Sequence, residues 1–402
     1  MHDLGFRPFD ADNHYYEAED AFIRHIDPAM QKRCMQWADV NGKKRLLVGG
    51  KINKFIPNPT FDPIAAPGSL EDYFRGKNEG GLDMKTMFGD LDPIAEHPGY
   101  RHRDARVQLL DEQGMDGALL FPTLGVGMQE ALKHDLPALH AAFRAFNDWL
   151  DEDWGFDRGD GRLYAAPMIT LADADEAAAE VDRVLAKGAR ILVTIPGPVP
   201  AGDGYVSPGH PRLDPVWARV AEAGVPMAFH AGLSGVNEYG KVWRTTSPGS
   251  GGGGGFSAFQ HAVFPMVAFA DRSISDTFAA LICHGVFERF PTLRTASIEN
   301  GAMWVPDLLR NLQAGAGKMP FAFKQHPVEQ FREHVWVAPF YEDDMAMLKD
   351  AIGIDRLLFG SDFPHTEGLP DPTFFVKDIP TFDEAETKAI MRDNVLDLIS
   401  AA

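Results

Sequence analysis

The sequence has little cysteine, no long apolar run and no cluster of basic residues. Its two cysteines, Cys34 and Cys283, lie far apart and match no zinc-binding or redox spacing. No disulfide framework is therefore implied, and two free thiols in a reducing cytosol are expected. No stretch approaches the ~20 apolar residues of a membrane span, and the N-terminus lacks the basic and apolar regions of a signal peptide. These absences predict a soluble, cytoplasmic protein.

Positive charge is scarce relative to negative charge. The 402 residues include 38 Lys and Arg but 58 Asp and Glu, which gives a formal net charge of −20. Without a basic block, such a chain is a poor partner for nucleic acid or for an anionic membrane. A small-molecule substrate fits this composition better.

Extended apolar runs and amphipathic helical segments alternate regularly from Tyr100 to the C-terminus. A first strand is predicted near 7–12 and a helix at 18–30, and later runs predict strands at 117–123, 162–169, 189–195, 225–230, 293–300, 333–340 and 356–361. Repeated βα units of this size predict a parallel sheet with right-handed crossovers, and eight such strands predict a closed barrel. We therefore expect an α/β fold, a (β/α)8 TIM barrel, with residues 1–402 in a single domain.

The barrel pattern is interrupted after the first strand, between residues 31 and 97. This segment contains a hairpin-like stretch around Gly49 and Gly50 and a tract rich in proline and glycine. We interpret 31–97 as an insertion that folds over the mouth of the barrel as a cap. The alternative is a surface decoration without function, in which case Lys51 and Lys54 are solvated charges.

A second interruption follows the fifth strand, between residues 231 and 265. It contains Gly249 and the run 251–255, whose glycines have no side chains to bury. A lid over the site and a plain flexible loop are both consistent with this composition. Neither Trp243 nor His261, which flank the glycines, receives a role from the sequence.

Several of the predicted strands end on side chains suited to bind a metal. Asp12 and His14 lie two residues apart in an extended segment, so their side chains share a face. His230 ends the fifth strand and Asp362 ends the eighth. Two imidazoles and two carboxylates suit Zn²⁺, Mn²⁺ or Fe²⁺, with positions left open for water or substrate. The alternative, four unrelated polar residues satisfied by loop backbone, requires a coincidence at several strand ends.

The stretches DADNH, FHAG, GVFERFPTLRTASIENG and LLFGSDFPH, in this order, resemble the amidohydrolase-related metal-dependent TIM barrels. That group contains aminocarboxymuconate-semialdehyde decarboxylase and γ-resorcylate decarboxylase, and Asp12-x-His14 is similar to the carboxylate-x-His variant of the latter. The resemblance implies that Asp12, His14, His230 and Asp362 bind a single divalent ion, with zinc expected and manganese or iron as alternatives. It also implies a homodimer. No lysine ends the ILVTI run, so a carbamylated lysine bridging two metals is not expected.

The sequence departs from this family at the end of the sixth strand, where Glu299 stands in place of the catalytic histidine of the decarboxylases. A carboxylate can act there as general acid or base. Asp362 and His365 are further catalytic candidates, although His365 is equally consistent with a hydrogen bond within its loop. His284 lies late in a helix that runs away from the strand tips, so we assign it a structural role.

Three functions are compatible with these residues. The first is hydrolysis of an ester, amide, lactone or C–C bond by a metal-activated water, with Glu299 or Asp362 as base. The second is non-oxidative decarboxylation of an aromatic or unsaturated acid. The third is a metal-bound binding protein without chemistry. The sequence assigns no substrate-binding residue, and the choice between the two reactions depends on the family resemblance.

Overall fold

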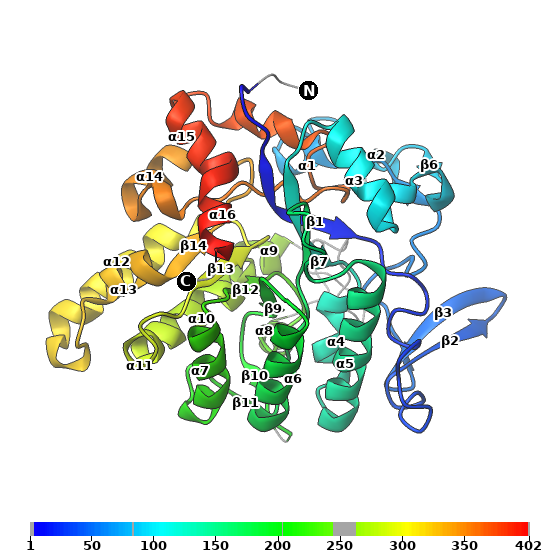
Figure 1. Ribbon diagram of the computed structural model, residues 1–402, viewed down its shortest axis with the longest axis horizontal. Coiled ribbons are helices and arrows are strands. Elements are labelled where there is room, and N and C mark those ends of the chain that lie inside the picture. Colours follow the sequence, from blue (N-terminus) through cyan, green and yellow to red (C-terminus); the bar gives the residue numbers. More distant parts are fainter. Residues whose placement is uncertain (1–3, 83, 203, 244–262, 401–402) are drawn as a thin grey trace.

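The computed structural model describes residues 4–82, 84–202, 204–243 and 263–400, with parallel strands at the centre and helices around them (Figure 1). One parallel sheet has the order β1-β7-β8, formed by β1 (Phe9–Tyr15), β7 (Gly117–Pro122) and β8 (Leu163–Ala165). The other has the order β14-β13-β12-β9, formed by β9 (Leu192–Thr194), β12 (Met227–His230), β13 (Thr295–Ile298) and β14 (Val335–Val337).

Parallel bridges connect these two sheets at both sides. Met168 pairs with Val193, which joins the end of β8 to β9. The segment 357–363, where strand eight was predicted, bridges to β14 at Leu357 and to β1 at Phe363. Its backbone amides donate on both sides, from Leu358 to the carbonyl of Val337 and from Asp362 to the carbonyl of Asp12, each at 2.8 Å. The carboxyl ends of β1, β12, β13 and this segment therefore lie together.

The helices follow the strands along the chain. They are α1 (Glu71–Phe74), α2 (Met84–Met87), α3 (Arg103–Glu112), α4 (Met128–Leu132), α5 (Leu136–Asp153), α6 (Ala174–Ala186), α7 (Asp214–Ala223), α8 (Val236–Lys241), α9 (Val263–Phe269), α10 (Arg272–Cys283), α11 (Val286–Arg289), α12 (Trp304–Lys318), α13 (Pro327–His334), α14 (Met345–Ile352), α15 (Glu384–Lys388) and α16 (Asn394–Ile399). Their boundaries reflect the predicted signals: Asp173 caps α6 with its side chain, and Gly224 ends α7 at φ +63°.

Aromatic side chains fill the layer between strands and helices. Phe229 on β12 lies 6.4 Å from Trp217 on α7 and 5.4 Å from Phe278 on α10, measured between ring centroids. Phe278 in turn stacks on Trp304 of α12 at 5.6 Å. All four rings are buried, and burying such large side chains provides much of the free energy that holds each helix against the sheet.

The predicted helix at 18–30 is wrong, because the chain forms a series of turns there. Its hydrogen bonds are mainly of turn type, for example from the amide of Ile23 to the carbonyl of Asp20 at 2.8 Å. Pro28 has no amide hydrogen and its ring is incompatible with a continuous helix at this point. Phe22 and Ile26 are buried, so packing of these turns against the core replaces helical regularity.

The segment 31–97 has two parts. The first is an antiparallel sheet of β2 (Met35–Val40), β3 (Lys43–Val48) and β4 (Lys51–Ile52), whose long hairpin projects from the body (Figure 1). Gly49 and Gly50 form its second turn with positive φ angles, as predicted. The second part includes β5 (Ile64–Ala65) and β6 (Leu91–Asp92) and reaches the loop after strand eight. There the amide of Leu70 donates to the carbonyl of Thr366 at 2.8 Å.

One lysine joins three loops that follow different strands. The side chain of Lys133, after α4, donates to Glu130, to Glu238 of α8 at 2.9 Å, and to the hydroxyl of Tyr205 at 2.8 Å. Tyr205 belongs to the small hairpin of β10 (Val199–Pro200) and β11 (Tyr205–Val206). The loops after β7, β9 and β12 are therefore tied together. The glycine run 249–255 and His261 lie outside the described residues, and Trp243 is half exposed at their edge.

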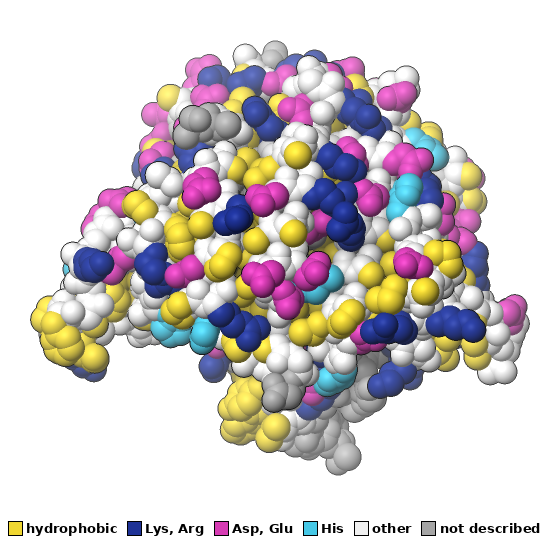
Figure 2. All heavy atoms as spheres, turned by 60° about the horizontal axis from the view of Figure 1, so that its bottom comes forward, with side chains coloured by type: hydrophobic (Ala, Val, Ile, Leu, Met, Phe, Trp, Pro, Cys, Tyr) yellow, Lys and Arg dark blue, Asp and Glu magenta, His cyan; other side chains and the backbone are white. Residues whose placement is uncertain are grey.

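The described part of the chain bears on three features that the sequence predicts to be absent: disulfides, membrane-spanning helices and basic patches. Cys34 is buried and Cys283 is exposed, and both are free thiols, as predicted. None of the described helices combines the length and the apolar character needed to cross a membrane. On the face shown in Figure 2, basic and acidic side chains are interspersed rather than gathered into a basic patch.

Candidate functional site

A bulge in β1 presents the first two candidate ligands. Asp10 pairs with Ala118 of β7, but the next pair joins Asn13 to Leu120, so β1 contains one residue more than its partner. Bulges of this kind bend a strand and redirect a side chain, and they are common beside active sites. Asp12 lies within the bulge, and its Oδ1 is 3.3 Å from Nε2 of His14.

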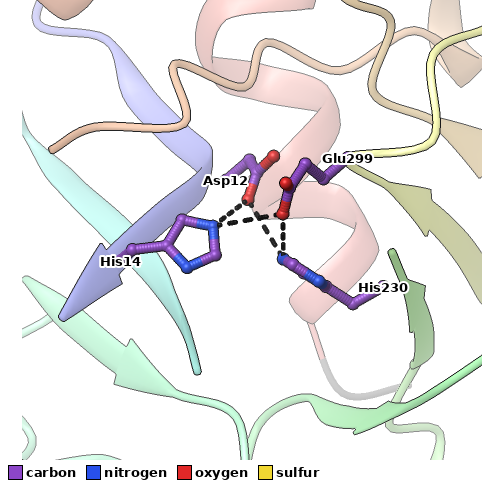
Figure 3. Close-up of side chains that lie close together, drawn as sticks. All are labelled: Asp12, His14, His230 and Glu299. Carbon is purple, nitrogen blue, oxygen red and sulfur yellow. Dashed lines mark ion pairs between the residues drawn. The ribbon is translucent and has the colours of Figure 1, made fainter. Parts of the chain in front are cut away.

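Four side chains from three strands meet at one point (Figure 3). Asp12 and His14 come from β1, His230 ends β12, and Glu299 follows β13. Nε2 of His230 is 3.6 Å from Asp12 Oδ1 and 3.1 Å from Glu299 Oε2. Glu299 Oε2 is also 3.6 Å from Nε2 of His14. The first three residues are buried, whereas the Glu299 side chain is 21% exposed and marks the open side of the cluster.

The buried atoms of this cluster fit a metal ion. Asp12 Oδ1, His14 Nε2 and His230 Nε2 have no hydrogen-bond partner, although such atoms are costly to leave unpaired inside a protein. Nδ1 of His230 lies 3.0 Å from the carbonyl of Ala231 and must donate to it, so Nε2 of the neutral ring offers its lone pair to a metal. Imidazole and carboxylate donors are the usual ligands of zinc, manganese and iron.

Asp362 and His365 stand beside this cluster. Asp362 Oδ1 is 3.2 Å from Nε2 of His14 and 2.6 Å from Nδ1 of His365. The rings of His14 and His365 are also close, with centroids 4.0 Å apart. No ion pair within 4.0 Å joins Asp362 to His230. The structure thus brings all the predicted site residues together, but Asp362 approaches the site from the side of His14 and His365 only.

Thr123, which the sequence analysis missed, holds His365 in place. Its hydroxyl donates to the carbonyl of Tyr15 at 2.8 Å, so it can only accept the hydrogen bond from Nε2 of His365, at 2.9 Å. The one available signal was its position directly after β7, at a predicted strand end. Residues 123 and 365 are far apart in the chain, so the sequence could not indicate their contact.

Crowding of carboxylates shapes the electrostatics of the site. Burial and the charge of Asp362 raise the pKa of Glu299 well above its usual value, and burial and nearby acids do the same for Asp362. Burial alone would also raise the pKa of Asp12, but the nearby imidazoles of His14 and His230 outweigh it and hold that pKa well below the ordinary range. A divalent cation would favour the ionised form of all three carboxyl groups.

Two site residues have an unusual backbone conformation. Glu299 and Asp362 both have φ of +56°, in the left-handed region that non-glycine residues rarely adopt. Asn300 stabilises the first of these turns, because its side-chain amide donates to the carbonyls of Ile298 and Phe229 at 2.7 and 2.9 Å. Such strain is typical of functional positions, and here it directs both carboxylates towards His14.

His284 takes no part in this arrangement. Its Nδ1 lies 2.9 Å from the hydroxyl of Ser207, and its side chain is exposed at the C-terminal end of α10. It belongs to neither group of possible metal ligands among the described residues. These contacts agree with the structural role assigned to it.

The chain matches a known family and is similar to several solved structures. The amidohydrolase family model matches residues 10–398. The crystal structure of an amidohydrolase from Mycobacterium avium subsp. paratuberculosis K-10 shares 45% sequence identity with this chain. The match covers 98% of this chain and 99% of that one, with a TM-score of 0.91.

More distant structures share the fold. A dihydroxybenzoic acid decarboxylase from Polaromonas sp. JS666, with bound manganese and 2-nitroresorcinol, is 16% identical over 98% of this chain and 97% of that one, with a TM-score of 0.62. A 5-carboxyvanillate decarboxylase from Sphingomonas paucimobilis is 16% identical over 99% of this chain and 100% of that one, with a TM-score of 0.60.

Proposed function

The chain belongs to the amidohydrolase family of metal-dependent TIM-barrel enzymes, and on this premise we propose that it hydrolyses a small, neutral carbonyl compound. Membership makes it a metal-dependent hydrolase or carboxy-lyase. The bridges that link both sheets through segment 357–363 support an eight-stranded closed barrel in a single domain. The contact of Leu70 with the loop after strand eight supports a cap formed by the second part of 31–97. A cytoplasmic homodimer stays our expectation from the family resemblance.

One divalent cation is the cofactor that this site suits. Asp12, His14 and His230 would hold it, with the carboxylates of Glu299 and Asp362 beside them. When bound, such an ion polarises a carbonyl group and lowers the pKa of water. Zinc fits the imidazole and carboxylate donors, and manganese is an alternative because the Polaromonas decarboxylase holds it in the same fold.

The negative charge of the site is the observation that favours a neutral substrate. Three carboxylates, Asp12, Glu299 and Asp362, surround the candidate metal position, and among the described residues only histidines form ion pairs with them. A single divalent cation does not neutralise three carboxylates. A carboxylate substrate would therefore meet repulsion at the metal position, where no lysine or arginine among the described residues pairs with these three carboxylates. An ester, amide or lactone would not.

The residues of the chain can also handle the proton of a hydrolysis. Asp362 is placed to accept a proton from the attacking water, and His365 is hydrogen-bonded to it and can pass the proton to the leaving group. Thr123 keeps the imidazole in the required orientation. His365 is buried and the Asp362 side chain is 14% exposed, which limits the access of bulk water to the transfer.

Decarboxylation is the second candidate, and Glu299 favours it. Because burial and the neighbouring charge raise its pKa, this carboxyl group is suited to keep a proton and to deliver it to the carbon that loses carbon dioxide. The decarboxylases among the fold relatives make the same reaction worth testing here.

Isotope labelling separates the two reactions. Zinc- or manganese-loaded protein is incubated with a panel of aryl esters, amides, lactones and hydroxybenzoic acids, once in H2¹⁸O and once in D2O. Hydrolysis incorporates one ¹⁸O atom into the acid product and releases no carbon dioxide. Release of carbon dioxide with one deuterium on the former carboxyl-bearing carbon would overturn our proposal in favour of decarboxylation. Absence of turnover across the panel would also count against it.

A further inference from the structure

The small antiparallel sheet of β2, β3 and β4, which we call the arm (35–52), has two unlike faces. Residues paired directly across such a sheet share a face, and successive residues along a strand alternate between the faces. One face is formed by the core residues Met35, Leu46 and Val48 and by Trp37, which packs against the core. This inner face holds the arm against the body, while the tip of the hairpin projects away from it (Figure 1).

The outer face of the arm is also apolar at its centre, but it lacks this packing. Ala38, Val40 and Leu47 are half-buried, yet none of them belongs to the hydrophobic core or packs against it. Ile52, which pairs with Leu47, is 43% exposed. A sheet face with a row of apolar side chains that the described part of the chain does not cover is a surface suited to a partner.

Positive charge borders this apolar row. Lys43 and Arg45 lie on the outer face, and neither has an acidic partner within 4.0 Å among the described residues, whereas Lys44 forms an ion pair on the inner face. With Lys51 the arm carries four bases and one acid, Asp39, in a chain with 58 acidic and 38 basic residues. The outer face of the arm is therefore an apolar and basic surface on an acidic protein.

A surface of complementary character lies in the groove between α5 and α6. Its cavity measures about 400 Å³ and is lined by apolar side chains such as Leu136 and Met168, by Arg144, and by three acids, Asp173, Glu176 and Glu180. Glu180 pairs with Arg183, but the exposed residues Asp173 and Glu176 have no basic partner within 4.0 Å among the residues that the structure describes. The groove thus offers apolar area and unpaired negative charge, which the arm matches in both respects.

The arm and the groove adjoin the same helix, α5. Arg33, which precedes β2, forms a bidentate ion pair with Asp135, the cap of α5, at 2.6 and 2.9 Å. Because the arm is anchored at this helix, a two-fold axis beside α5 can bring each arm to the groove of the other copy, and closed two-fold dimers are the commonest assembly. We propose that the outer face of the arm docks in the α5–α6 groove of a second copy of this chain, and that the second arm docks reciprocally in the first.

A second copy suits the arm better than a nucleic acid or an anionic membrane does. A chain with a net charge of −20 is repelled by both of these, whereas a second copy supplies Asp173 and Glu176 beside an apolar cavity. A dimer also contains the contact twice. Stable interfaces bury about 800 Å² per partner, and two contacts reach this area more readily than one.

Charge reversal tests this interface in the full-length protein. Sedimentation velocity over a range of concentrations gives the dissociation constant of the parent dimer, which has twice the chain mass of 44.3 kDa. Arg45→Glu and Glu176→Lys should each raise this constant about a hundredfold, since each brings like charges together at both contacts. The double variant Arg45→Glu/Glu176→Lys restores opposite charges, so its constant should lie at least about tenfold below that of either single variant.

Lys318→Glu is the matched control for a change of charge. Lys318 is exposed at the end of α12, on the side of the molecule away from the arm (Figure 1). The same reversal should leave the dissociation constant unchanged there. Circular dichroism and thermal unfolding show whether each variant is folded. Glu176 is exposed on α6, so Glu176→Lys tests the proposal even where Arg45→Glu fails to fold.

Several results would overturn the proposal. They are a parent that is monomeric at high micromolar concentration, a dimer that survives both reversals, equal weakening by Lys318→Glu, and weakening by Arg45→Glu alone, which would seat the arm on another surface. Binding of a monomeric parent to single-stranded DNA or to phosphatidylserine vesicles, with loss of binding in Arg45→Glu, would assign the arm to that partner instead. None of these measurements involves metal or turnover, so their failure is distinct from failure of the proposed hydrolysis.

Discussion

Two buried aspartates on β1, only two residues apart, have opposite surroundings. Asp10 accepts hydrogen bonds from the amide of Asp12 at 3.0 Å, the side chain of Asn13 at 2.9 Å and the amide of Ser361 at 3.0 Å, and also from the Ser361 hydroxyl. Asp12 has an oxygen without any such partner that faces two imidazoles. The protein satisfies the first carboxyl group itself and leaves the second for a ligand.

The pKa values of the two carboxyl groups are shifted in opposite directions, as their different surroundings require. Burial raises the pKa of Asp10 to about 7, because its hydrogen bonds only partly offset the loss of solvent. The histidines outweigh burial at Asp12 and hold its pKa well below the usual range. Identical residue types in the stretch DAD therefore serve different purposes, and part of the difference arises from Ser361 and His230, which lie far away in sequence.

Arg106 belongs to the structural half of this comparison. It is fully buried on α3 and donates to the carbonyls of His14 at 2.7 Å and Gly99 at 2.6 Å, and to the side chain of Asn13. It thereby holds β1 on the C-terminal side of the bulge. Because Arg106 holds β1 in this way, the donor atoms of Asp12 and His14 keep their positions when the metal is absent.

The largest expected effect is loss of metal from the site formed by Asp12, His14 and His230. His230→Ala and Asp12→Asn should each lower metal occupancy sharply, because each removes a donor and distorts the remaining geometry. Elemental analysis should find about one divalent ion per chain in the parent. Full occupancy and unchanged activity in His230→Ala would contradict the assignment of the metal centre.

Removing Asp10 should instead lower stability. Asp10→Ala leaves buried donors of Asn13 and Ser361 unpaired, which we expect to cost about 3 kcal/mol in the free energy of unfolding. Asp12→Asn should cost less than about 1 kcal/mol in metal-free protein, since the affected oxygen has no partner there. Urea unfolding in the presence of a chelator measures both. Equal losses would remove the distinction between the two aspartates.

A third buried acid, Glu17, makes the free energy of unfolding depend on pH. It accepts amide hydrogen bonds from Thr123, Leu124 and Gly125, and burial raises its pKa from 4.5 to about 7. The folded protein therefore binds a proton more tightly than the unfolded chain. The resulting stability is fully present below pH 4.5 and is lost as the pH rises through about 7, by up to about 3 kcal/mol.

Glu17→Gln should remove this contribution. Its free energy of unfolding is expected to change less than that of the parent between pH 4.5 and 8, because glutamine does not titrate. Urea unfolding at several pH values, with chelator present, gives the two slopes. Identical slopes would show that another group is responsible.

The smallest effect is expected for His284→Gln. This residue contacts Ser207 and lies outside both ligand groups, so metal content and turnover should equal those of the parent. A small change in thermal unfolding is compatible with loss of that contact. A large loss of turnover in folded, metal-loaded protein would place His284 in the site and contradict its structural role.

Much of the barrel was predictable because its strands are short apolar runs that end on polar side chains. Asp12, His14 and His230 could be assigned from their positions at such ends, and segment 357–363 from the run that delivers Asp362. The bulge in β1 was not predictable, since the extra residue is defined only by pairing with β7. The turns at 18–30 resemble a helix in sequence because Phe22 and Ile26 recur at helical spacing, although Pro28 is incompatible with a continuous helix.

The position of Glu299 shows a further limit. Its place at the end of the sixth strand was predicted, but its direction depends on a left-handed backbone that no glycine signals. Its distance from both imidazoles follows from that conformation and from the anchor provided by Asn300. Contacts of this kind, like that between Thr123 and His365, join distant parts of the chain and become visible only in three dimensions.

The two sets of contacts around the mouth have a mechanical consequence. Lys133 ties the loops after β7, β9 and β12 into one unit, whereas the loop after strand eight is tied to the insertion through Leu70 and Thr366. A displacement on one side would be shared among the loops of that side, and the hydrogen bond between Thr123 and His365 is one contact through which it would reach the other side. Substitution of Lys133 would therefore release the loops after β7, β9 and β12 from one another, while the loop after strand eight would stay held to the insertion through Leu70 and Thr366.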